Sequence, residues 1–203
     1  MKITAMVAMA AVAALSARGA EVSAKGRPVT VFISNEHAVP ATNFAKDQAA
    51  RMFARIGVTI EWRSAGRSAL PPDAIVVDIL EQSEASECAG ALACAKPFEG
   101  VHIRVFSDRL KRVVTESTVP ALLAHVLVHE ITHILEGTAS HSDSGIMKAR
   151  WDTKDFDRMP RSPLAFTNLD VQLIQLGIAT REAKLVASLN APAERGPHVV
   201  AAN

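Results

Sequence analysis

Two histidines and a glutamate have a spacing that can hold a metal ion and activate water. His129, Glu130 and His133 form the pattern HExxH within the run HVLVHEITHILE. On an α-helix, residues four apart lie on one face about 6 Å apart along the axis, so both imidazoles can bind one Zn²⁺. The glutamate beside the first histidine can then reach a metal-bound water as general base. The pattern predicts a metal site with hydrolytic chemistry.

The segment that carries these residues is predicted to be a long, buried helix. Thr118 can cap it, Pro120 fits its first turn, and Gly137 is a natural stop. Nearly every residue between them is apolar, which indicates burial along most of the helix surface. Two histidines and a glutamate are costly there without a metal or other partners. This weighs against the alternative that they are hydrogen-bonded core residues.

A hydrolytic zinc site needs a third protein ligand and an open fourth position. His141, Glu136 and Asp143 are the candidates. Glu136 lies on the same helical face as His129 but further along the axis. His141 follows the glycine stop, and imidazole is the commoner zinc ligand, so His141 is favoured while the other two remain open. We expect one zinc ion.

His125 precedes His129 by four residues and shares its helical face. It could hold a metal ligand or a carboxylate in place. The favoured interpretation is a hydrogen-bonded core histidine.

The elements that must position these residues follow from hydrophobic periodicity. Strands are predicted over 29–33, 58–62, 74–80 and 101–106, and helices over 43–56, 118–136 and 170–177. Thr167 and Asp170 match a capping box for the last helix, which is expected to end at Gly177. This order predicts an α+β fold, with helices packed on one mixed, twisted sheet. The domain would span 28–180, after a linker (21–27) and before a partly disordered C-terminal extension (181–203).

The N-terminus has the pattern of a signal peptide over residues 1–20. Lys2 is followed by an apolar run over 3–15 and by small residues over 16–20. The apolar run has 13 residues, whereas a membrane-spanning helix needs about 20. An uncleaved anchor is the alternative. We expect a secreted or periplasmic protein with no membrane span in the mature chain.

The two cysteines, Cys88 and Cys94, are six residues apart. In an exported chain this even count at close spacing favours a disulfide. A pair of metal ligands is the alternative, but the offset is unusual for zinc. The formal charge of +1 argues against nucleic-acid binding, which normally needs a marked basic excess. We expect a monomer.

The run HEITHILEGTASHSDSGIMKA resembles the metzincin superfamily of zinc peptidases, which carry HExxHxxGxxH and a later methionine in a tight turn. The resemblance implies a single zincin-like or metzincin-like domain, with Gly137 as the turn glycine. It makes His141 the third ligand and Met147 the turn methionine. The HS pair before this methionine is most similar to the matrixin branch. Eight positions rather than six separate His133 from His141, which leaves the subfamily and the third ligand open.

The resemblance further implies a zinc metallopeptidase, more an endopeptidase than an exopeptidase, acting on peptides or proteins through a water activated by Glu130. The chain has no tyrosine, so zinc must provide most of the oxyanion stabilisation. The strand over 101–106 would border the cleft and pair with substrate, with Arg104 either near the peptide or simply solvated. The following loop would line the pocket with Lys148, Arg150, Trp151, Lys154, Arg158 and Arg161.

Two other functions stay open. One is a zinc-containing binding or structural module with little turnover, although such a module has no need of a base at Glu130. The other is hydrolysis of a non-peptide amide. The segments HEITH, HS and GIMKARW also resemble those of exported bacterial proteins, a resemblance that implies no activity.

Overall fold

The structure is a computed structural model that describes residues 28–39, 42–65, 70–71, 73–83, 88, 90–95 and 101–190. The predicted signal peptide (1–20), the linker (21–27) and the end of the C-terminal extension (191–203) lie outside the described residues.

Five strands form one mixed sheet in the order β2-β1-β3-β5-β4. They span Val29–Ser34 (β1), Ile60–Ser64 (β2), Ile75–Leu80 (β3), Ala93–Ala95 (β4) and His102–Phe106 (β5). The pairs β1–β2, β1–β3 and β3–β5 are parallel, and β4 runs antiparallel to β5 at one edge. β-Branched residues dominate the buried face, as expected for a half-buried pleated surface. The prediction of an α+β domain with a mixed sheet is confirmed.

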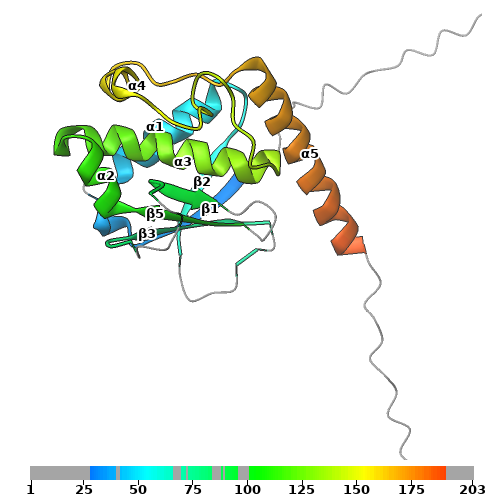
Figure 1. The fold of residues 1–203 in the computed structure, drawn as a ribbon. Helices are drawn as coiled ribbons and strands as arrows, with labels where there is room; N and C mark the ends of the chain where they lie inside the picture. Colours follow the sequence, from blue (N-terminus) through cyan, green and yellow to red (C-terminus); the bar gives the residue numbers. More distant parts are fainter. Residues whose placement is uncertain are drawn as a thin grey trace, which may run out of the picture.

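Helices cover the buried face of this sheet (Figure 1). They span Thr42–Ala54 (α1), Ser107–Val113 (α2), Val119–Glu136 (α3), Thr153–Arg158 (α4) and Asn168–Asn190 (α5), with 3₁₀ turns at Glu36–Ala38 and Glu116–Thr118. α1 and α3 lie side by side above the strands. Val31, Val77 and Ile103 from the sheet and Leu127 from α3 belong to one core of buried side chains.

α3 is buried along almost its whole length. Gly137 ends it with φ 67°, and its N–H donates to the His133 carbonyl. Thr118 sits at the N-cap without a side-chain capping bond, so its predicted role as a hydrogen-bonding cap is wrong. By length and composition alone, residues 116–136 could cross a membrane, but 89% of their most apolar 18-residue window is buried inside the fold, as in a core helix.

α5 does not end at Gly177, as the sequence predicted, but continues to Asn190. A Cβ on Gly177 would lie 1.6 Å from the Leu135 carbonyl oxygen of α3. The glycine is therefore needed for close helix packing rather than as a stop. The predicted capping box is confirmed, because Asp170 accepts from the Thr167 N–H at 2.7 Å and its own N–H donates to the Thr167 hydroxyl at 3.2 Å.

Three short elements were not predicted. β4 has three residues, α2 seven and α4 six, lengths over which hydrophobic periodicity carries little information. α4 lies in the segment expected to be a loop and begins with a capping box from Asp152 and Asp155.

Candidate metal centre and cleft

α3 and the loop after it bring three histidines together. One ring nitrogen from each of His129, His133 and His141 lies within 4.8 Å of the other two. His129 and His133 are buried one turn apart in α3, whereas His141 is exposed and is reached after the chain turns at Gly137. Among the described residues, this group includes neither Glu136 nor Asp143.

The hydrogen bonds of the two buried histidines fix which ring nitrogen carries the proton. His129 Nδ1 lies 2.9 Å from the Ile146 carbonyl oxygen, and His133 Nδ1 lies 3.0 Å from that of Thr138. A carbonyl oxygen only accepts, so each Nδ1 is protonated and each neutral Nε2 presents a bare lone pair. The two Nε2 atoms are 3.1 Å apart. Two lone pairs this close are unfavourable unless a cation lies between them.

The donor set fits Zn²⁺. Burial lowers the pKa of His129 to about 4 and also lowers the pKa of His133, which keeps both imidazoles neutral and able to bind metal. Zinc–nitrogen bonds of about 2.0–2.1 Å in a tetrahedral site place ligand nitrogens about 3.3 Å apart, close to the observed 3.1 Å. Backbone carbonyls on Nδ1 are the usual support for such ligands. Three histidines would leave one position open.

Glu130 lies beside this centre, 8% exposed. Burial raises the pKa of its carboxyl to about 7, partly opposed by a hydrogen bond from the Ala95 backbone in β4. A carboxylate with a pKa near neutrality can take up and release a proton at neutral pH. The residue therefore has the burial and basicity expected of a general base.

A tight turn holds the segment below His129. The Ser142 N–H donates to the Met147 carbonyl at 2.8 Å, and Met147 is 1% exposed. The adjacent Ile146 carbonyl is the partner of His129 Nδ1. The turn that contains Met147 thus orients one histidine directly and lies next to the loop that carries His141.

Asp170 links this turn to the start of α5. Its carboxylate accepts from the Ser142 hydroxyl as well as from the Thr167 N–H, and it is 2% exposed. Burial, and then the charge of Asp170, raise the pKa of nearby Glu136 to about 7. The capping pattern identified Asp170 from the sequence, but nothing in the sequence indicated its bond to Ser142.

A cleft of about 770 Å³ opens over the histidines and Glu130. Its walls are the face of α3 that carries His129 and His133, β4 with the loop before it, and the segment around 148–156. Lys148, Arg150 and Trp151 line it as predicted, whereas Lys154, Arg158 and Arg161 are not among its lining residues. Lys148 is held by Asp152 and Asp155.

β5 does not border the cleft, contrary to the sequence-based expectation. It lies between β3 and β4, and its two edges are both paired. Its Arg104 is exposed and is not among the residues that line the cleft. The edge strand beside the cleft is β4, which sequence reasoning missed. The Phe106 N–H donates to the Leu92 carbonyl, so by alternation the backbone groups of Ala93 and Ala95 face away from β5, toward the cleft.

Trp151 stands edge-on to the ring of His129, with centroids 5.4 Å apart. His125 donates from Nδ1 to the Ala121 carbonyl at 2.7 Å, and its Nε2 accepts from the Leu164 N–H at 3.1 Å. His125 is therefore the hydrogen-bonded core histidine favoured by the sequence.

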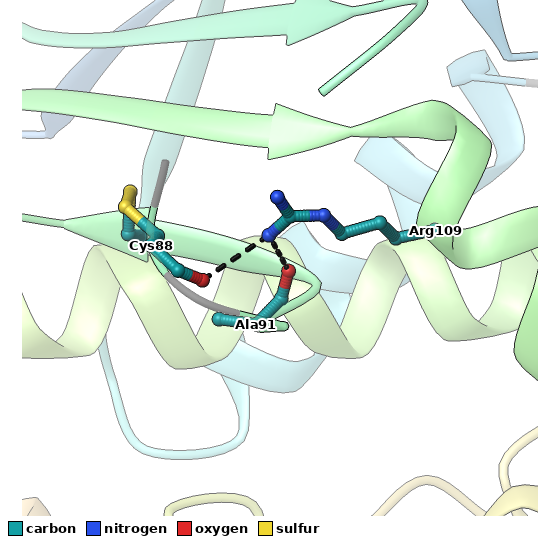
Figure 2. Close-up of a disulfide and its surroundings, with 4 residues drawn as sticks. Cys88, Ala91 and Arg109 are labelled. Atoms are coloured by element: carbon teal, nitrogen blue, oxygen red, sulfur yellow. Dashed lines mark hydrogen bonds between the residues drawn. A yellow bond between two sulfur atoms is a disulfide. The ribbon is translucent and has the colours of Figure 1, made fainter. Parts of the chain in front are cut away.

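Cys88 and Cys94 form the predicted disulfide, so this prediction is confirmed. Cys94 lies within β4 and lines the cleft, so the disulfide ties this wall of the cleft to Cys88. Figure 2 shows the disulfide near Arg109.

The fold is shared with zinc peptidases. Archaemetzincin from Methanopyrus kandleri superposes with a TM-score of 0.56 and 13% identity, over 81% of this chain and 99% of that one. A zinc-dependent peptidase from Methanocorpusculum labreanum gives a TM-score of 0.50 and 10% identity, over 71% and 99%. At these identities the likeness concerns the fold alone. No protein-family model matches the sequence, and no curated protein is detectably similar to it.

Proposed function

We propose that this protein is a zinc-dependent metallopeptidase that cleaves internal peptide bonds. The observation that carries the proposal is the pair of bare Nε2 atoms, 3.1 Å apart, beside a buried carboxylate in an open cleft. The likeness of the fold to zinc peptidases supports it. The ligands would be His129, His133 and His141, which form the three-residue group found among the described residues.

The chemistry follows from what each side chain can do. Zinc in such a site supplies a Lewis acid and lowers the pKa of water in the open position. Glu130, which lines the cleft, accepts a proton from the attacking water and passes it to the amide nitrogen that leaves. The chain has no tyrosine, so no phenolic hydroxyl shares in stabilising the oxyanion.

The substrate would lie along β4. The outward-facing backbone groups of Ala93 are suited to pairing with an extended peptide, which is the mode called β-strand addition. A cleft open at the surface accepts a chain that continues in both directions, and this favours an endopeptidase.

We also propose that the protein is exported, as a secreted or periplasmic enzyme. The proposal rests on the signal-peptide pattern over 1–20 and on the disulfide, since disulfides persist mainly in oxidising compartments.

The test is cleavage of a diverse peptide mixture by the mature chain, read by mass spectrometry, with zinc content measured on the same samples. The matched variant is Glu130→Gln, which keeps the size of the side chain but removes its basicity. We expect the wild type alone to cleave, with about one zinc per chain in both proteins.

The other results separate the alternatives. Zinc in both proteins without cleavage by either would favour a binding module or a hydrolase of non-peptide amides. Cleavage by the variant at the wild-type rate would refute the role of Glu130. Absence of zinc from both would remove the basis of the proposal.

A further inference from the structure

The chain that leads into β4 is a closed loop. Cys88 and Gly90 have left-handed backbones, with φ of 45° and 80°, and the Ala91 N–H donates to the Cys88 carbonyl at 2.8 Å. The disulfide then joins Cys88 to Cys94 inside the strand. The position of the edge strand therefore depends on how this loop is held.

Arg109 of α2 is buried and donates hydrogen bonds to two backbone carbonyls of this loop. The residue is 8% exposed, and its Nη1 donates to the Cys88 carbonyl at 3.1 Å and to the Ala91 carbonyl at 2.7 Å (Figure 2). Its guanidinium carbon lies 4.2 Å from the centre of the Phe106 ring. A buried guanidinium needs hydrogen-bond acceptors, and an aromatic face beneath it adds to its stability. These contacts fix the loop relative to α2.

The groups that this loop positions are those of the cleft wall. All residues from Gly90 to Ala95 line the cleft. Ala95 and Glu130 both line the cleft, and the backbone of Ala93 faces away from β5. A shift of the loop would therefore move the peptide-binding edge relative to the base.

We infer that Arg109 and the Cys88–Cys94 disulfide are positioning groups for the reaction, which together clamp β4 for peptide pairing beside Glu130. This inference rests on the proposed peptidase function. Arg109 bonds to the loop and packs on Phe106, and neither it nor the two cysteines belong to the three-histidine group. A merely structural role predicts a loss of stability alone, whereas a clamp predicts a loss of binding that grows with the length of peptide lying along β4.

The experiment compares Arg109→Gln, Arg109→Lys and the double variant Cys88→Ser/Cys94→Ser with wild type. Arg112→Gln is the matched control, because Arg112 lies in the same helix but is 69% exposed and pairs with Asp108. One measurement is amide hydrogen exchange over residues 90–95 in the zinc-loaded mature chain. The other is kcat and KM for two peptides that share a scissile bond, one minimal and one long enough to lie along β4.

We expect faster exchange over 90–95 in Arg109→Gln and in the double variant, with zinc content unchanged. For the long peptide, KM should rise about tenfold, because the interaction that is lost contributes equally to binding in the ground state and in the transition state. For the minimal peptide, KM should change much less. Arg109→Lys should recover part of the effect, and Arg112→Gln should behave as wild type.

Unchanged exchange over 90–95 in Arg109→Gln would overturn the clamp, whatever the activity. Faster exchange with equal KM changes for both peptides would overturn the positioning role. If Arg109→Gln does not fold, Arg109→Lys and the double variant decide by the same criteria. If wild type cleaves nothing, the proposed function fails, while hydrogen exchange still decides whether Arg109 holds β4.

Discussion

His129 and His133 have their protons on Nδ1 because each Nδ1 faces a backbone carbonyl. The helix sets the spacing of these two rings, but it does not set the position of His141, which comes from the loop beyond Gly137. Sequence reasoning could therefore establish the first pair from periodicity and left the third ligand open. The loop conformation that decides it depends on contacts such as the bond from Ser142 to Asp170, which have no sequence signal.

The third ligand can be tested by zinc affinity. His141→Ala should weaken zinc binding by at least about a hundredfold, because even the loss of a supporting group can cost 10- to 100-fold. Asp143→Ala removes a nearby exposed carboxylate outside the histidine group and should leave the affinity unchanged. Competition against a chromogenic chelator measures both. The reverse order of effects would assign the ligand to Asp143.

Glu136 should make stability depend on pH. Burial and then Asp170 raise its pKa from 4.5 to about 7 in the folded state, so the folded chain binds more protons than the unfolded chain between these values. The free energy of unfolding should therefore fall as the pH rises from about 4.5 to 7 and stay low above it.

Glu136→Gln has no charge to lose and should flatten this dependence. In the zinc-free protein, its melting temperature should exceed that of wild type at pH 8 and approach it at pH 4.5. Thermal unfolding at both pH values measures the difference. An equal response of both proteins to pH would contradict the assigned pKa.

The close contact between α5 and α3 predicts that alanine in place of Gly177 lowers the stability of the protein, the opposite of its usual effect in a helix. Alanine normally stabilises a helix interior by about 1 kcal/mol relative to glycine. At Gly177, however, the added Cβ would meet the Leu135 carbonyl oxygen at 1.6 Å, so Gly177→Ala should destabilise by about 1–3 kcal/mol.

The control is Ala183→Gly in the same helix, at an exposed position. It should destabilise by about 0.5–1 kcal/mol through helix propensity alone. Chemical denaturation measures both variants. Stabilisation by Gly177→Ala would show that the helices are further apart than described.

The elements also show why parts of the fold escaped prediction. The long helix α3 has an almost continuous apolar run that ends at Gly137, and β5 alternates in polarity, so both were found. β4 has three small residues, Ala93, Cys94 and Ala95, and becomes a strand only because it pairs with β5. The end of α5 was misplaced because a packing glycine and a terminating glycine look the same in sequence; only the proximity of Leu135 distinguishes them.

For the whole molecule, metal binding should stabilise the fold. A ligand at 1,000 times its dissociation constant adds about 4 kcal/mol, and a domain of this size gains about 2–4 °C per kcal/mol. Zinc should therefore raise the melting temperature of the chelator-treated protein by about 8–16 °C. His133→Ala should show little of this shift. Differential scanning calorimetry with and without chelator checks both, and an equal shift in the variant would place the metal elsewhere.

The histidine centre and the cleft differ in how far apart their parts lie along the chain. The three histidines fall between residues 129 and 141, and the carbonyls that orient them belong to Thr138 and Ile146. The cleft also needs β4, a strand that forms only by pairing with β5 in the sheet. Local contacts form earlier in folding than distant ones. We therefore expect zinc to be captured before the cleft can act, which would protect the chain from cutting its own unfinished segments.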